Sequence, residues 1–125
     1  MLRPANMRRM MSGTRIHIPT ARKNGIVTYE HDGWPKHIVY IGGRYTRGGY
    51  NLPDSPWKNP YNRAFRNKEI TREEAVARYR EYMLNSEELL ARLGELEGKT
   101  LACWCALDVR CHGDVLLELL QERGS

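Results

Sequence analysis

The chain has 125 residues, of which 41% are hydrophobic and 28% charged, and this fits one compact domain of a soluble protein. No segment approaches the ~20 consecutive apolar residues that span a bilayer, and the basic N-terminus lacks the apolar core of a secretory signal. We therefore expect a cytoplasmic protein with no membrane partner. The net charge of +5 favours partners that carry phosphate.

Three segments in the first third of the chain have the pattern of β-strands. Residues 1–13 are basic, and we expect a flexible tail there, ahead of a single domain over residues 14–125. Apolar and polar residues alternate in residues 14–20, which is typical of a half-buried strand. The β-branched residues 25–29 predict a second strand, and the continuous apolar run over 37–41 predicts a strand covered on both faces.

A long aperiodic segment separates these strands from the first predicted helices. Residues 42–69 are rich in glycine, proline and aromatic side chains, and a loop of this length in a small domain is often functional. Thr71 and Glu74 form a capping box, which predicts the start of a helix. A second helix is expected to begin at Ser86 and to stop near Gly98.

The C-terminal part of the chain predicts one more strand and one more helix. The strand is expected over residues 99–105 and the helix over residues 113–120. The order β-β-β, long loop, α-α, β, α predicts the α/β class. We expect a small single-domain α/β sandwich with a partly parallel mixed sheet and an N-terminal β segment.

All three cysteines lie from the end of the last predicted strand to the start of the last predicted helix. They are Cys103, Cys105 and Cys111, and His112 follows directly. The odd number and close spacing favour free thiols over a structural disulfide. Together these four side chains are candidate ligands of zinc or iron, since Cys103 and Cys105 point to one face of a strand. The alternative is that Cys103 or Cys105 is a buried hydrophobic residue.

The same segment also suggests catalysis by a free thiol. Cys111 stands before the last helix, where free amides and the helix dipole lower the pKa of a thiol. Cys111 would then be the nucleophile, His112 the acid or base, and Asp114 the residue that orients His112. Taken alone, Asp114 is explained equally well as a carboxylate that stabilises the first helical turn.

Two groups of residues in the long segment are candidate ligand-binding residues. Gly42 and Gly43 allow the backbone to approach a ligand closely, and Arg44 offers a planar guanidinium to a phosphate. Trp57 could stack on a base, and Asn59 could hydrogen-bond to a base edge or a ribose. A tight turn and a loop anchored on the core would explain the same residues without any ligand.

Several of these motifs resemble the domain-of-unknown-function family 4326, which occurs in bacteria, phages, viruses and some eukaryotes. The resemblance rests on VYIGGR, on the RGGYNLPDSPWKNPY loop, on REEAVARYREYM and above all on GKTLACWC…CHGDVLLELL. It implies one shared site but no reaction. The residues that it assigns to that site are Gly42, Arg44, Trp57, Asn59, Pro60, Cys103, Trp104, Cys105, Cys111, His112, Gly113 and Asp114.

The sequence therefore predicts a small cytoplasmic, phage-encoded protein that binds or processes a nucleotide or nucleic-acid component. It would act as a cysteine-dependent or metal-dependent enzyme. One alternative is a non-catalytic, zinc-stabilised module that binds nucleic acid or protein. Another is an interaction protein that inhibits a host enzyme through its basic tail.

Overall fold

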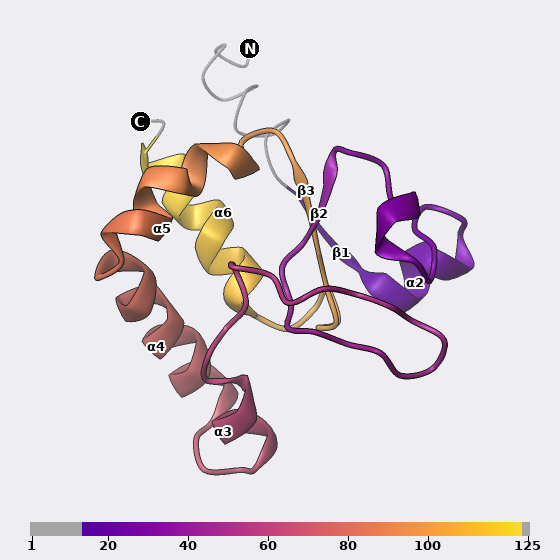
Figure 1. Ribbon diagram of the computed structural model, residues 1–125. Helices are drawn as coiled ribbons and strands as arrows, with labels where there is room; N and C mark the ends of the chain where they lie inside the picture. The colour runs from indigo at the N-terminus through magenta and orange to yellow at the C-terminus, as the bar shows by residue number, and fades with distance from the viewer. Residues whose placement is uncertain (1–13, 124–125) are drawn as a thin grey trace.

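Three short parallel strands form the centre of the molecule (Figure 1). The computed structural model describes residues 14–123. β1 (Thr14–His17) and β2 (Ile38–Tyr40) each pair in parallel with β3 (Thr100–Cys103), which gives the sheet order β1-β3-β2. Because the strands run in the same direction, the segments that follow all three leave the same edge of the sheet.

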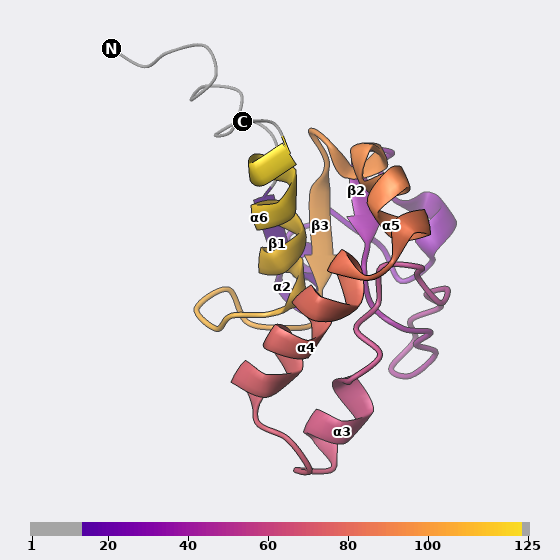
Figure 2. The same cartoon turned by 90° about the vertical axis from the view of Figure 1, so that its left-hand side faces the viewer.

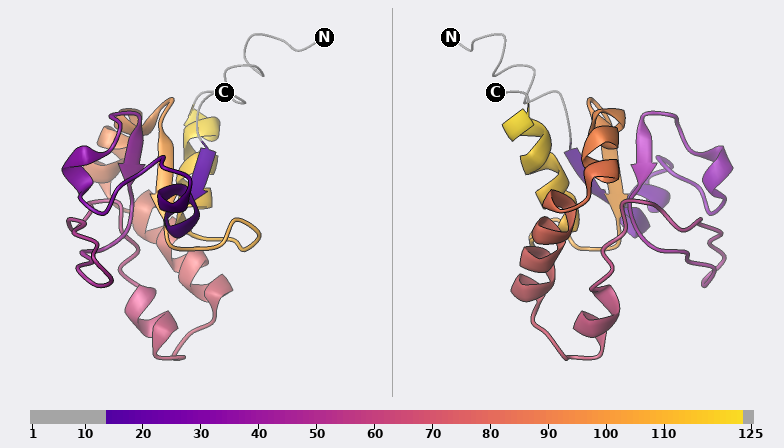
Figure 3. Two further views of the ribbon diagram at one scale, coloured as in Figure 1. Left: turned by 90° about the vertical axis from the view of Figure 1, so that its right-hand side faces the viewer. Right: turned by 60° about the vertical axis from the view of Figure 1, so that its left-hand side comes forward.

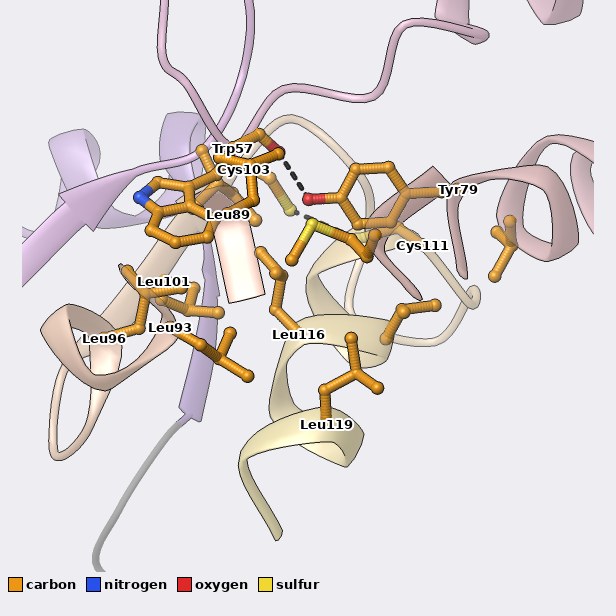
Figure 4. Close-up of a cluster of buried hydrophobic side chains, with 14 residues drawn as sticks. Trp57, Tyr79, Leu89, Leu93, Leu96, Leu101, Cys103, Cys111, Leu116 and Leu119 are labelled. Atoms are coloured by element: carbon orange, nitrogen blue, oxygen red, sulfur yellow. Dashed lines mark hydrogen bonds between the residues drawn. The ribbon is translucent and has the colours of Figure 1, made fainter. Parts of the chain in front are cut away.

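Three helices cover one face of the sheet (Figure 2). They are α4 (Arg72–Leu84), α5 (Glu87–Arg92) and α6 (His112–Arg123). Their apolar faces pack on β3 and form the larger core cluster, part of which Figure 4 shows. The buried members of this cluster are Ile41, Trp57, Val76, Tyr79, Met83, Leu89, Leu93, Leu96, Leu101, Cys103, Cys111, Val115, Leu116 and Leu119.

Shorter elements and loops cover the opposite face of the sheet (Figure 3). The helix α2 (Ile18–Lys23) and the 3-10 turn η1 (His31–Gly33) lie in this layer, and residues 45–52 extend along it. A second core cluster fills the space beneath them, formed by Ile18, Ala21, Val27, Trp34, Ile38, Tyr40, Leu52 and Ala102. The two covered faces together make one small α/β domain, which confirms the predicted fold class.

Local signals in the sequence account for the helix starts. Thr71 and Glu74 form the predicted capping box of α4, with both of its hydrogen bonds present. Ser86 caps α5 by accepting a hydrogen bond from the amide of Leu89 at 3.3 Å. A 3-10 turn, η2 (Leu93–Leu96), continues α5 toward β3.

Three local predictions about the fold are wrong. Residues 25–29 form no strand, because this segment finds no partner in the sheet and its Val27 is buried in the second core cluster. The first strand ends at His17, since Pro19 stands in the first turn of α2. The described strands are all parallel rather than mixed.

The remaining predictions about the fold concern the long aperiodic segment, the N-terminal tail and membrane-spanning helices. The aperiodic segment over residues 42–69 contains a short helix, α3 (Asn62–Arg66), that has no clear sequence signal. The predicted tail over residues 1–13 lies outside the described residues. Within those residues, every helix is too short or too polar to cross a membrane.

Candidate functional site

The three cysteines gather at the carboxyl edge of the sheet. Cys103 ends β3, Cys105 lies in the following turn, and Cys111 immediately precedes α6. Their sulfur atoms all lie within 4.8 Å of one another, and the Sγ atoms of Cys103 and Cys111 are 3.6 Å apart (Figure 4). Cys103 and Cys111 are buried, whereas Cys105 is partly exposed. We call these three residues the thiol cluster.

Local structure explains why the thiols meet. Trp104 donates a hydrogen bond to the Tyr40 hydroxyl at 3.0 Å and packs against the second core cluster, on the face of the sheet opposite α4, α5 and α6. Cys103 and Cys105 pack with the larger cluster instead, as strand alternation predicts. Cys111 caps α6, since its sulfur accepts a hydrogen bond from the amide of Gly113 at 3.3 Å.

Arg15, on β1, holds the loop between Cys103 and Cys111 in place. Its side chain is only 5% exposed. The guanidinium lies 3.5 Å from the Cys103 sulfur and 3.3 Å from an Asp114 carboxylate oxygen. It also donates to four backbone carbonyls of the loop, those of Cys105, Ala106, Leu107 and Val109, at 2.8 to 3.4 Å.

The charge of Arg15 is retained in this buried position. Burial opposes the charged form, but the Cys103 and Cys111 sulfurs and the Asp114 carboxylate more than offset it. The pKa of Arg15 is therefore raised above its ordinary value. Sequence reasoning missed Arg15, because its only signal was an arginine in a short strand 88 residues from the thiol that it contacts.

A second arginine flanks the thiol cluster on the side of α4. The Nη1 atom of Arg72 lies 3.8 Å from the Cys105 sulfur, and its guanidinium stacks over the Phe65 ring at 4.7 Å from the ring centroid. Hydrogen bonds from the Cys103 and Cys111 thiols, together with that from Arg72, lower the pKa of Cys105. These hydrogen bonds favour the thiolate form of Cys105.

The other two thiols behave in the opposite way. The hydrogen bond to Cys105 raises the pKa of Cys103, although the bond with Cys111 lowers it, and the hydrogen bonds to Cys103 and Cys105 raise the pKa of Cys111. The pKa shifts of the three thiols therefore favour Cys105 as the thiolate, whereas the sequence predicted Cys111 as the nucleophile. The hydrogen bonds to two adjacent sulfurs oppose the lowering of the Cys111 pKa that its place at the start of α6 predicts.

The predicted partner of Cys111, His112, is not part of the thiol cluster. Its ring is buried, and Nε2 donates a hydrogen bond to the carbonyl oxygen of Ile41 at 2.7 Å. The Tyr79 ring packs against it edge-on, with 5.0 Å between the centroids. Burial lowers the pKa of His112, so the imidazole is neutral and helps to join α6 to the segment after β2.

Asp114 also has partners other than the predicted one. One carboxylate oxygen accepts the amide hydrogen of Cys111 at 2.8 Å, and the other faces Arg15 at 3.3 Å. The first contact holds the backbone at Cys111, and the second pairs with the positive charge of Arg15. Asp114 therefore positions Cys111 and Arg15, and the orientation of His112 comes from Ile41.

The glycines after β2 are explained by packing around Tyr40. A Cβ atom on Gly42 would lie 2.5 Å from the Tyr40 hydroxyl, which donates a hydrogen bond to the carbonyl of Gly43. Arg44 is exposed and lines a groove of about 470 Å³ that contains Glu30 and Asp54 and none of the cysteines. The structure does not bring Arg44 together with the thiol cluster.

Trp57 and Asn59 anchor the loop after β2. Trp57 is 3% exposed and lies in the same core cluster as Cys103 (Figure 4). Its carbonyl oxygen accepts a hydrogen bond from the Tyr79 hydroxyl at 2.7 Å. Asn59 is also buried, and its amide group bonds to the Ala75 carbonyl at 3.2 Å and the Tyr61 amide at 2.9 Å. These contacts match the loop-anchor alternative left open by the sequence.

The thiol cluster has the composition and spacing of a metal site. Tetrahedral zinc with Zn–S bonds of ~2.3 Å holds its sulfur ligands roughly 3.8 Å apart. The three sulfurs already lie within 4.8 Å of one another, so small side-chain shifts would bring them to that geometry. Three close cysteines that could hold a metal ion are thus present, without the fourth ligand expected from His112.

Comparison with known proteins places the thiol cluster within a family. The family model for a domain of unknown function, DUF4326, matches residues 26–122, which include all three cysteines and Arg72. Arg15 precedes the matched residues. The chain is also similar to an uncharacterized protein of Acanthamoeba polyphaga mimivirus, R718, with 40% identity over 89 residues. This match spans 65% of each chain, and no solved structure matches the protein. The chain therefore belongs to the DUF4326 family.

Proposed function

We propose that the protein is a metal–thiolate protein that binds zinc or iron through Cys103, Cys105 and Cys111. The observation that carries this proposal is the approach of three sulfurs to within 4.8 Å of one another at the end of a parallel strand. Thiolates are the preferred ligands of zinc and of iron–sulfur sites, and His112 is engaged elsewhere.

The charges around the cluster support a bound cation with three thiolates. Three thiolates and one divalent ion carry a net charge of −1, which is costly in a partly buried site. The guanidiniums of Arg15 and Arg72 lie 3.5 and 3.8 Å from two of the sulfurs and would offset that charge. Arg15 also holds the loop carbonyls, so the ligands are arranged before the metal arrives.

The presence of three protein ligands favours a catalytic metal site over a purely structural one. Structural zinc sites have four protein ligands, whereas catalytic sites have three and keep one position for water or substrate. Cys105 is the partly exposed member of the cluster, and we infer that the open position would be reached from its side. We infer that the fourth position receives water or substrate, and that the substrate is a nucleotide or nucleic-acid component, consistent with the net charge of +5.

A second candidate function is thiol chemistry without metal. It is favoured by the lowered pKa of Cys105, caused by the two neighbouring thiols and by Arg72. In this case Cys105 would be the nucleophile, and Cys103 and Cys111 would donate hydrogen bonds to its thiolate. Both candidate functions use the same three cysteines, so an experiment must distinguish metal binding from metal-free thiol chemistry.

Elemental analysis combined with thiol titration at pH 7 tests both candidates. The metal site predicts one zinc or iron per chain and three thiols that react only after a chelator removes the metal. Substitution Cys105→Ser should abolish stoichiometric binding. A metal-free protein with one fast-reacting thiol, lost in Cys105→Ser and kept in Cys103→Ser, would support the second candidate. Absence of both metal and a fast thiol would contradict both.

A further inference from the structure

A groove lies between α4 and the segment that leads into α6; none of the cysteines lines it, but Arg72 in its wall contacts the Cys105 sulfur. Its volume is about 520 Å³, which is within the range of sites for small molecules. Arg72, Arg80 and Arg110 line it, and Val76 and Val109 supply apolar surface. We propose that this groove binds the phosphate group of a small substrate, with Arg72 as the principal ligand.

Arg72 differs from the other arginines of the groove in its partners. Arg80 pairs with Glu118 and Glu122, and Arg110 pairs with Glu118, so these guanidiniums are already neutralised. Among the ion pairs of residues 14–123, none includes Arg72. No carboxylate in the described part of the chain neutralises this guanidinium, and only its Nη1 atom contacts the Cys105 sulfur, so its other nitrogen atoms can donate to a bound anion.

The guanidinium of Arg72 is also held in a defined orientation. It stacks on the Phe65 ring, at 4.7 Å from the centroid, and one of its nitrogen atoms contacts the Cys105 sulfur. A guanidinium that is fixed on one face and free at its edge can donate two parallel hydrogen bonds to a phosphate at low entropic cost. This arrangement sets Arg72 apart from an exposed surface arginine.

The dimensions and walls of the groove indicate the class of substrate. A groove of this volume has room for a small molecule, and Val76 and Val109 would contact the uncharged part of it. The substrate would therefore be a phosphorylated small molecule, a class that includes nucleotides. The role of the metal next to this phosphate depends on the proposed function, whereas binding of the phosphate by Arg72 does not.

Titration of the full chain with phenyl phosphate, followed by ¹H–¹⁵N NMR, tests this inference. The probe combines a phosphate with an apolar body, and phenol is the uncharged comparison. Binding should shift the amide signals of Arg72, Val109 and Arg110. Arg72→Gln should weaken binding at least tenfold, because a charge-assisted contact is lost.

Two further variants control for effects on folding and overall charge. Arg78→Gln makes the same charge change on α4, at an exposed residue that pairs with Glu74 and does not line the groove, and should leave affinity unchanged. Glu73→Gln removes the carboxylate that lines the groove and should tighten binding. Equal affinity in Arg72→Gln and the unaltered protein, equal weakening in Arg78→Gln, or phenol binding as tightly would overturn the inference.

Repeating the titration with and without zinc separates this inference from the proposed function. Binding that depends on Arg72 in a protein that takes up no metal would support the groove and contradict the metal site. Stoichiometric zinc without binding that depends on Arg72 would support the metal site and overturn the groove.

Discussion

The loops that follow β2 and β3 leave the same edge of the sheet and both carry residues suited to a ligand, yet folding uses them differently. After β2, Trp57 and Asn59 are buried and their polar groups bond to α4 and to the loop itself. After β3, the three thiols lie together beside two guanidiniums. Residues of types that can bind a ligand therefore form a site only where their polar atoms or thiols are not already used to hold the fold together.

The largest expected effect tests the structural role of the loop after β2. Trp57→Ala should lower the free energy of unfolding by about 4 kcal/mol, because it empties a large buried volume next to Tyr79. Lys58→Ala, at the exposed neighbour that pairs with Asp54, should cost less than about 1 kcal/mol. Urea denaturation measures both. A small effect of Trp57→Ala would return Trp57 to the list of ligand-binding residues.

The next largest effect tests the support of the loop after β3. Arg15→Ala should cost about 3 kcal/mol, since it leaves four carbonyls and the Asp114 carboxylate without their buried donor. Arg110→Ala, which breaks an exposed ion pair, is the matched control, with an expected cost below about 1 kcal/mol. If both variants unfold at the same urea concentration, Arg15 does not hold the loop.

His112 links the two loops, and its burial predicts a dependence of stability on pH. The folded pKa lies below the ordinary value of 6.5, so acid favours the unfolded chain, which binds the proton more readily. Stability should fall as the pH drops from 6.5 toward the folded pKa, by at most about 1.4 kcal/mol per pH unit. Metal-free His112→Gln should lose this dependence, whereas His37→Gln, at an exposed residue, should keep it. An unchanged pH profile in His112→Gln would contradict the prediction.

The smallest effect on stability is expected at the thiol with the greatest functional role. Cys105→Ser in metal-free protein should change the free energy of unfolding by less than about 1 kcal/mol, because Cys105 is partly exposed and the two side chains are similar in size. Cys103→Ser, at a buried position, should cost more. Urea denaturation in the presence of a chelator measures both, and equal costs would show that Cys105 is as much a core residue as Cys103.

Local patterns predicted much of the secondary structure. The capping box at Thr71, the cap at Ser86 and the apolar strand before Gly42 are short-range signals, and each is present in the fold. Residues 25–29 show the limit of such signals. Their β-branched side chains favour an extended segment, but in the fold the segment pairs with neither edge strand and its Val27 fills the second core cluster instead.

By itself, the sequence determined where the candidate site lies, because the three cysteines are joined by one short segment between a strand and a helix. Only the tertiary structure decided which neighbours complete the site. Arg15 and Arg72 are separated from their thiols by 88 and 33 residues, and only the pairing of β1 with β3 and the packing of α4 bring them there. The same packing engages His112 with Ile41, because a buried imidazole needs a hydrogen-bond partner and the nearest carbonyl supplies it.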